Sequence, residues 1–582
     1  MRYFCLISDY DGTLAHDGQV TASTLEALKR VKASGRKLVL ATGRELPDLL
    51  RVFPETSLFD LAVVENGALL YNPATGEKRL LAEAPPAAFV EELRRRGVVP
   101  LSVGESIVAT WHPHETVVLE VIRTLGLEMQ VIFNKEAVMI LPSGVNKGTG
   151  VRAALDELGL STHNALGVGD AENDHAFLGI CECSVAVENA LPVLKERADV
   201  VTAKARGEGV EEIIEQLLTD DLRSLQPRLK RHDILLGRTD SGEEFCLGPY
   251  GTRVAVAGPS GGGKSTVVTA IVERLIQKQY QVCVIDPEGD YDDFGQIVTL
   301  GGSDRIPGLS EILEVLKTGG SSISINLLGV PAADRPNYFV GLLPRLQELR
   351  SRTGRPHWIV IDEAHHLLPS ELDSASLSIP SSLGSFALIT VHPKSVSRVL
   401  LEAVNHVIAI GPEPGAVIEE MNERAGKSWS APGTTNSAAP GAPSSGAGER
   451  TGQLLVWQLP ESNPPIQVML EPAKAVLRRH RRKYASGELG EDKSFYFRGP
   501  GGKLNLRAQN LTLFTQIAEG VDEETWLHHL RKNDYSQWFR EAVKDDGVAD
   551  EIEVIEQNTT LAPAESRRLI LETIGKHYTN PS

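Results

Sequence analysis

Two carboxylates that stand one residue apart, Asp9 and Asp11, are the first groups along the chain whose spacing suggests chemistry. They follow the apolar run 3–7, which predicts a short buried strand, and they flank the start of a Gly-Thr turn. Side chains two positions apart on an extended segment point the same way, so the carboxylates should repel each other unless a cation lies between them. We favour a divalent metal ion, with a solvated turn that caps the next helix as the alternative.

Three later segments carry groups that suit a phosphate ester. ATGR at 41–44 supplies the Thr42 hydroxyl and the Arg44 guanidinium, which can donate hydrogen bonds to phosphoryl oxygens. GVNKGTG places Lys147 at the start of a predicted helix, where its charge can neutralise a phosphoryl group. GVGDAEND supplies three side chains with hard oxygen atoms suited to Mg²⁺: Asp170, Asn173 and Asp174.

The elements that must bring these segments together form an alternating pattern. Strand-like runs at 37–42, 60–71 and 164–170 are separated by amphipathic stretches, which predicts a mostly parallel sheet flanked by helices. Ligands gather at the carboxyl ends of the strands in such sheets. We therefore expect these segments to meet at one edge of the sheet.

The order and context of these motifs, over roughly residues 1–215, resemble the haloacid dehalogenase superfamily of phosphatases. The resemblance implies that Asp9 is a nucleophile that forms an aspartyl-phosphate and that Asp11 acts as general acid and then base. It implies that Thr42 and Lys147 hold the transferring phosphoryl group. It also implies an Mg²⁺ site made by Asp9, the Asp11 backbone carbonyl and Asp170, and supported by Asn173 and Asp174.

The segment between Thr42 and Lys147 is longer than one crossover requires. From about residue 68 to residue 143 it resembles the α/β cap of subfamily IIB, which contains phosphosugar and phosphoglycolate phosphatases, and ENGA at 65–68 fits that subfamily. Such a cap covers the site and selects the substrate. His112, His114 and Arg123 are candidates for this role, with ordinary surface residues as the alternative.

A second phosphate-binding loop follows the strand RVAVAG, in the stretch GPSGGGKST at 258–266. Its amides are expected to cradle the β-phosphate of a nucleotide, with Lys264 on the β and γ oxygens and Ser265 on Mg²⁺. The expected nucleotide-binding residues are Gly258, Gly261, Gly263, Lys264, Ser265, Thr266 and Asp362.

A strand that ends in Asp362 and Glu363 completes the expected nucleotide site. Asp362 would hold Mg²⁺ through water, and Glu363 would polarise the attacking water, which favours ATP hydrolysis over transfer to an acceptor. In SFALITVHP, Thr390 and His392 stand like a γ-phosphate sensor, with a plain turn residue as the alternative for His392.

Together with QVCVIDPEGDYDDF at 281–294, these motifs resemble the HerA and FtsK branch of RecA-like ATPases over roughly residues 234–470. The branch includes hexameric DNA-translocating motors, so the resemblance implies a homo-oligomer, with a hexamer as its form. Two departures from the family pattern argue against DNA translocation. No Gln stands in the sensor strand, and the small barrel that usually precedes the core is not recognisable.

The 582 residues, 41% hydrophobic and 23% charged, predict a globular α/β chain of several domains. We expect a Rossmann-like phosphatase at 1–225, a RecA-like ATPase at 226–470 with a flexible loop at 426–448, and a small, mostly helical domain at 471–582. A basic run at 478–483 is read as a solvated helix face, with polyanion binding as the alternative. The residues expected to form the helical core are Trp526, Leu530, Tyr535, Trp538 and Phe539.

A net charge of −18 argues against general binding to nucleic acid or anionic lipid. Five cysteines without a CxxC pair are typical of a reducing compartment, and with no long apolar span we expect a cytoplasmic protein without membrane contact.

The favoured interpretation is a bifunctional protein that needs Mg²⁺ and ATP and acts on a small phosphorylated metabolite. One alternative is a polynucleotide kinase-phosphatase, with nucleic acid as the partner of the ATPase domain. The other is an interaction protein in which ATP switches conformation and the phosphatase is the effector.

Overall fold

The computed structural model describes the chain except residues 135, 260–261, 293, 371–383, 427–451, 459–463, 475–493, 544–545 and 579–582. The chain divides into two units. The first contains 1–285, 307–325 and 330–473, and the second contains 286–306, 326–329 and 474–582. Nearly all of the expected loop at 426–448, and the whole basic run at 478–483, lie outside the described residues.

The first unit opens with an eight-stranded sheet in the order β12-β11-β10-β1-β2-β3-β4-β5. Pairing is parallel from β12 to β3, as the alternating pattern predicts, and β4 and β5 are added antiparallel. The strands are β1 (Cys5–Asp9), β2 (Lys37–Ala41), β3 (Leu61–Val64), β4 (Leu69–Tyr71), β5 (Lys78–Leu80), β10 (Ala165–Gly169), β11 (Cys183–Ala186) and β12 (Val200–Val201). The flanking helices are α1 (Ala22–Ala33), α2 (Leu46–Val52), α5 (Lys147–Glu157), α6 (His175–Ile180), α7 (Pro192–Arg197) and α8 (Arg206–Asp220).

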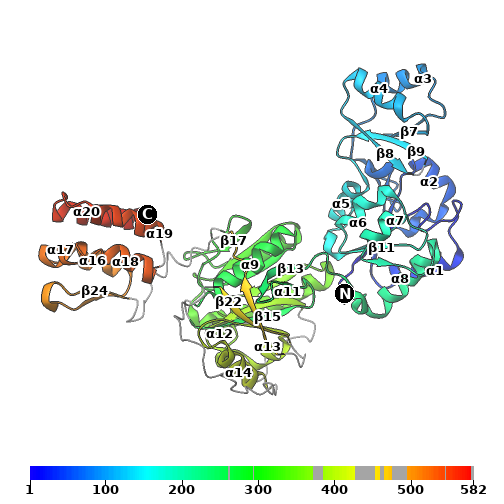
Figure 1. The fold of residues 1–582 in the computed structure, drawn as a ribbon. Coiled ribbons are helices and arrows are strands. Elements are labelled where there is room, and N and C mark those ends of the chain that lie inside the picture. The colour runs from blue at the N-terminus through cyan, green and yellow to red at the C-terminus, as the bar shows by residue number, and fades with distance from the viewer. Residues whose placement is uncertain are drawn as a thin grey trace. The chain divides into compact units, whose positions relative to one another are not determined.

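The inserted cap has its own four-stranded antiparallel sheet, in the order β6-β7-β9-β8. Its elements are α3 (Ala87–Arg95), β6 (Ser102–Val103), β7 (Val108–Trp111), α4 (Glu115–Leu125), β8 (Met129–Asn134) and β9 (Ala137–Pro142). Figure 1 shows α3 and α4 together on one face of this sheet, where their apolar side chains form one core with Val108, Val138 and Ile140. The insertion starts later than the expected residue 68, because β4 and β5 hydrogen-bond to the first sheet.

The part of the first unit that carries the glycine-rich loop is a second sheet, whose strands in this unit follow the order β14-β13-β23-β22-β21-β15-β20-β19-β16-β18. The strands β21, β15, β20, β19 and β16 pair in parallel, and β20 separates the strand before the glycine loop from the strand before Asp362. The strands are β13 (Ile234–Thr239), β14 (Glu244–Leu247), β15 (Arg253–Ala257), β16 (Val282–Asp286), β18 (Ser322–Asn326), β19 (Trp358–Ile361), β20 (Ser385–Thr390), β21 (His406–Ala409), β22 (Gln453–Gln458) and β23 (Ile466–Leu470). The helices are α9 (Lys264–Gln277), α10 (Leu309–Lys317), α11 (Arg335–Thr353), α12 (Ala364–Leu367), α13 (Arg398–Ala403) and α14 (Pro414–Ala425).

The second unit is built mainly from helices near the end of the chain. The helices α16 (Leu511–Gly520), α17 (Glu523–Leu530), α18 (Asp534–Trp538), α19 (Asp546–Gln557) and α20 (Pro563–Tyr578) follow a hairpin of β24 (Phe495–Phe497) and β25 (Leu506–Ala508). The five residues expected to form a helical core all belong to one buried cluster, in which the rings of Trp526 and Tyr535 stack at 4.5 Å. No helix in the described parts of the chain has both the length and the apolar character that crossing a bilayer requires.

Candidate active sites

The first candidate site lies where β1 ends, and a sharp turn there joins the first motif to the last one. Asp9 is the final residue of β1 and is 4% exposed. Gly12 has φ +88°, and a Cβ at this position would lie 2.4 Å from Oδ2 of Asp170. Thr13 donates a hydrogen bond to Asp170 at 3.2 Å. Only glycine fits this close approach, which places Asp170 beside the turn that carries both opening carboxylates.

Lys147 links two of the acidic groups. It is the first residue of α5, where Asn146 and Thr149 form a capping box, and its side chain is almost fully buried. Its Nζ lies 2.5 Å from Oδ1 of Asp9 and 2.7 Å from Oδ1 of Asp174. Burial alone would lower the pKa of Lys147, but the two carboxylates raise it above its usual value, so the ammonium stays charged.

The acidic groups outnumber the one lysine. Burial, and next the repulsion of Asp174, raise the pKa of Asp9 above its usual range. Carboxylate oxygens of Asp9, Asp170 and Asp174 all lie within 4.8 Å of one another. The Oδ1 atom of Asn173 is buried and has no hydrogen-bond partner among the described residues. Three carboxylates and an unsatisfied amide oxygen around one ammonium fit a divalent cation such as Mg²⁺.

Arg44 was expected to donate to phosphoryl oxygens, but in the structure it contacts two carboxylates. Its Nε and Nη2 atoms each donate to a different oxygen of Asp11 at 2.7 Å, and its Nη1 donates to Asp48 at 2.5 Å. Arg44 therefore binds the second opening carboxylate, because two nearby acids compete with any phosphate oxygen for its donors. Thr42 is buried, and its hydroxyl oxygen accepts the amide of Arg44 at 3.1 Å, which leaves its own proton free to be donated elsewhere.

The two histidines among the three predicted cap candidates contact other cap residues, and the arginine is exposed. His112 pairs with Glu115, His114 contacts the Val99 carbonyl, and Arg123 is exposed on α4. A cap residue that does lie near motif ATGR is Met139 on β9, since a Cβ at Gly43 would lie 2.9 Å from its Cε atom.

Two neighbours in ENGA also contact groups far along the chain, a role that their spacing did not reveal. Asn173 donates to the Oδ1 atom of Asn66 at 3.1 Å, beside the acidic cluster. The Glu65 carboxylate accepts backbone amides of the cap. The ENGA motif was the only sequence signal for either residue.

The glycine-rich loop forms the second candidate site. It connects β15 to α9, with Gly263 at φ +96° before Lys264, the first residue of the helix. A Cβ at Gly258 would lie 2.4 Å from the Ile410 carbonyl oxygen, so the loop passes close to its neighbour only because glycine stands there. Lys264 is 4% exposed and its Nζ donates to the Pro259 carbonyl at 2.8 Å.

Other predicted members of the loop vary in exposure. Ser265 is half-buried and Thr266 is exposed, each one turn or less into α9. Gly261 lies outside the described residues. The strand, loop and helix order is the one that nucleotide binding requires.

Asp362 and Glu363 stand at the end of β19 as expected. Both are buried, the Glu363 amide donates to Asp362 at 2.9 Å, and Glu363 has a left-handed backbone with φ +42°. Strained backbone of this kind clusters at functional sites.

A histidine next to this pair was not singled out from the sequence. The Nδ1 atom of His365 lies 3.3 Å from the Thr390 hydroxyl and 3.6 Å from Glu363. Burial, and then its neighbour His366, lower the pKa of His365 to about 4, so its ring is neutral near pH 7. The predicted sensor residue His392 has its ring centroid 5.4 Å from that of His365. Asp362, Glu363, the Thr390 hydroxyl at the end of β20 and the His365 ring therefore form one polar cluster.

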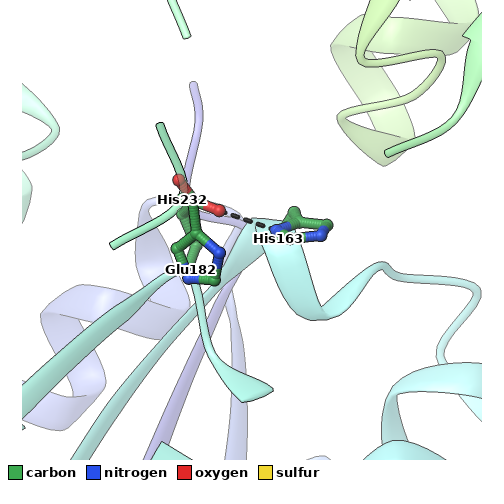
Figure 2. A group of neighbouring side chains, drawn as sticks. All are labelled: His163, Glu182 and His232. Carbon is green, nitrogen blue, oxygen red and sulfur yellow. Dashed lines mark hydrogen bonds and ion pairs between the residues drawn. The ribbon is translucent and has the colours of Figure 1, made fainter. Parts of the chain in front are cut away.

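A third cluster also has the composition of a metal site. Figure 2 shows Glu182 hydrogen-bonded to His163, with His232 beside them. Burial would raise the pKa of Glu182, but the hydrogen bond from His163 and the charge of Arg2 lower it to about 2. Tyr280 donates to the same carboxylate at 2.7 Å. Since the carboxylate is already satisfied by Arg2, His163 and Tyr280, we interpret the cluster as a structural polar network.

The two candidate sites lie in segments that match two different protein families. Residues 6–98 and 121–214 match the haloacid dehalogenase-like hydrolase family, and residues 244–335 match the central domain of helicase HerA. The phosphoglycolate phosphatase of Halorubrum lacusprofundi is 29% identical over 225 residues, which cover 37% of this chain and 97% of the relative. Phosphoglycolate phosphatase 2 of Saccharolobus solfataricus is 32% identical over 225 residues, which cover 36% of this chain and 91% of the relative. A solved haloacid dehalogenase-like hydrolase from Bacteroides thetaiotaomicron is 20% identical, covers 37% of this chain and 99% of its own, and has a TM-score of 0.33.

The first match covers the segments that carry Asp9, Thr42, Lys147 and Asp170. The fold brings Asp9, Lys147 and Asp170 together in one acidic site. The second covers the glycine-rich loop but ends before Asp362. Through its amino-terminal third, the chain belongs to the haloacid dehalogenase-like hydrolase family.

Proposed function

We propose that this chain is a bifunctional enzyme, with a phosphomonoester phosphatase in its first domain and an ATPase in its second. The observation that carries the first activity is the buried triad in which Lys147 contacts both Asp9 and Asp174. A lysine held between a nucleophile and an acid that supports the metal site suits phosphoryl transfer, because it offsets charge on both.

In the proposed phosphatase reaction, the carboxylate of Asp9 attacks phosphorus and forms an aspartyl-phosphate while the ester oxygen leaves. Asp11 donates a proton to that oxygen and then accepts one from the water that hydrolyses the intermediate. Arg44 donates to both oxygens of Asp11, so Arg44 must release this carboxyl group before Asp11 can act as the acid. Lys147 and the Thr42 hydroxyl hold the phosphoryl oxygens.

Mg²⁺, when bound, supplies positive charge that neutralises the crowded carboxylates and the incoming phosphate. Asp9, Asp170 and the Asp11 carbonyl would hold it. Asp174 orients the site by accepting the amides of Asp170 and Ala171, each at 2.9 Å.

The proposed substrate is a small phosphorylated metabolite. Two relatives that align over nearly their full length are named phosphoglycolate phosphatases, which makes 2-phosphoglycolate the first ester to test. The inserted cap argues against the polynucleotide kinase-phosphatase alternative, since a polynucleotide end needs an open approach to Asp9.

The proposed ATPase uses the glycine loop and Lys264 to hold the nucleotide phosphates, with Ser265 and Asp362 on the side of the metal ion. Glu363 polarises the attacking water. The HerA match over residues 244–335 supports nucleotide binding by this domain. A homo-oligomer, with a hexamer as the form to test, is also part of the proposal.

Paired variants test both activities. Asp9→Asn should abolish release of phosphate from p-nitrophenyl phosphate and leave ATP turnover intact, and Lys264→Ala should do the reverse. Phosphatase activity that survives in Asp9→Asn would contradict the first assignment. ATP turnover measured with DNA, with RNA and with a 5′-hydroxyl oligonucleotide separates a translocating motor and an end-processing kinase from an ATP-driven switch.

A further inference from the structure

The carboxylate of Glu65 has no part in the chemistry proposed above, yet it is completely buried. It lies directly after β3, in the short helical turn 65–67 that links the core strand β3 to β4. Its Oε1 atom accepts the amide of Glu105 at 2.9 Å, and its Oε2 atom accepts those of Ser106 and Ile107 at 2.8 and 3.1 Å. The acceptor belongs to the core and the donors belong to the cap.

These three hydrogen bonds satisfy a buried carboxyl group. In the described part of the chain no cation forms an ion pair with Glu65, and the partners of its side chain are these backbone amides. The turn that donates them is closed by its own hydrogen bond from Gly104 to the Ile107 carbonyl at 2.9 Å. Separating the turn from Glu65 would leave a carboxylate and three amides without their partners, which is costly in a dry interface.

The backbone of Glu65 is held equally firmly on the core side. Its amide donates to the Arg44 carbonyl at 2.9 Å, and the amide of Asn66 donates to the Thr42 carbonyl at 3.0 Å. Glu65 and Asn66 both have left-handed φ angles, +49° and +53°, which the packed surroundings must impose. Gly67 continues the contact, because a Cβ there would lie 2.0 Å from the Asn146 carbonyl oxygen, next to Lys147.

On the cap side the same turn leads into the inner face of the cap sheet. Ile107 packs in one apolar cluster with Ala68, Met139 and Leu141. Met139 in turn reaches Gly43, the neighbour of Thr42. Contacts therefore run without a break from Glu65 through the turn 104–107 to the cap residue that lies over motif ATGR.

We propose that Glu65 is a positioning residue that latches the cap turn 104–107 to the core and so sets how the cap closes over the phosphate ester. The latch favours the closed cap in the free enzyme. Without it, part of the substrate's binding free energy is used to close the cap, so KM rises while kcat at saturation is kept. The kinetic part of this proposal rests on the phosphatase function proposed above, whereas the structural part does not.

Glu65→Gln tests the latch with little change in volume. The glutamine side chain has one oxygen to accept with and sets its NH₂ group against a backbone N–H, so at least one of the three hydrogen bonds is lost. Hydrogen exchange of the full-length protein, followed by mass spectrometry on peptides that span 102–110, should become about 10- to 100-fold faster. With p-nitrophenyl phosphate and with 2-phosphoglycolate, KM should rise about 10-fold and kcat should stay within about threefold.

Gly104→Ala disrupts the same contact from the cap side, and it tests the latch independently if Glu65→Gln does not fold. A Cβ at Gly104 would lie 2.7 Å from Oε1 of Glu65, and its φ angle is not left-handed, so alanine is tolerated by the backbone while the carboxylate is displaced. It should reproduce both effects. Glu105→Gln is the matched control, because it removes a carboxylate from the same turn that is 39% exposed and pairs with Lys78.

Unchanged exchange at 102–110 in Glu65→Gln and Gly104→Ala would overturn the latch, as would an equal effect in Glu105→Gln. Faster exchange combined with a fall in kcat at constant KM would overturn the positioning role. If the wild-type protein hydrolyses neither ester, the proposed phosphatase function fails, and the exchange experiment still decides whether Glu65 holds the cap.

Discussion

Replacing Lys147 with methionine should destabilise the phosphatase domain through charge. The methionine fills most of the space of the lysine but leaves Asp9 and Asp174 without the ammonium that now lies within 2.7 Å of both. Removal of one partner from a buried ion pair costs about 3–5 kcal/mol. At about 2–4 °C per kcal/mol for a domain of this size, the transition temperature of the domain should fall by about 6–20 °C.

The stability of Lys147→Met should depend on pH in a direction that the charge argument fixes. In Lys147→Met, Asp9 loses the nearby positive charge that lowers its pKa. The pKa of Asp9 in the folded state, which burial and then Asp174 already raise, therefore rises further above that of the unfolded chain. The folded variant then holds protons that the unfolded chain has lost, and its stability falls as the pH rises from 5 to 8. Millimolar Mg²⁺ should restore more stability to the variant than to the wild-type protein, because the cation replaces the lost charge.

Scanning calorimetry of the metal-free protein at pH 5 and pH 8, with and without Mg²⁺, measures these changes. Lys195→Met is the matched control, since Lys195 lies 3.8 Å from Glu188 at the surface and its loss should change stability by less than about 0.5 kcal/mol. An unchanged transition in Lys147→Met at pH 8 would refute the charge argument. An equal loss at both pH values would assign the effect to packing instead.

Three further predictions concern the other domains. Glu363→Gln should lower ATP turnover by about 10²- to 10⁴-fold without weakening nucleotide binding. A coupled assay measures turnover and a fluorescent-nucleotide titration measures binding. Normal turnover in this variant would contradict the assignment of Glu363. Gly258→Ala should lower nucleotide affinity, measured by the same titration, because its Cβ would lie 2.4 Å from the Ile410 carbonyl oxygen and force the loop to move; unchanged affinity speaks against this geometry. Burial raises the pKa of Glu556 to about 7, so the folded second unit keeps a proton that the unfolded chain loses above about pH 4.3, and its stability should fall as the pH rises toward 7. Glu556→Gln should remove this dependence in hydrogen exchange of α16–α20, and a dependence that persists would assign it to another group.

The two candidate sites could be predicted from the sequence because their residues lie in short segments with local rules. A strand followed by spaced carboxylates, or by glycines and a lysine, specifies which side chains stand at the end of a strand or the start of a helix. The structure places Asp9 at the end of β1 and Asp362 directly after β19, and it places Lys147 and Lys264 at the first positions of α5 and α9. The aromatic core of the last helices was predictable for the same reason, since helical periodicity is local.

What only the tertiary structure decided involves partners that are far apart or that compete. Arg44 could serve a phosphate or a carboxylate by its type alone, and the positions of Asp11 and Asp48 determined the choice. The cap begins after β5 because β4 and β5 found hydrogen-bond partners on the core sheet, which no local pattern encodes. Glu65 binds a turn about forty residues away through backbone amides, and backbone donors carry no sequence signature. Local spacing thus determined which groups are available for chemistry, and long-range pairing determined what each of them touches.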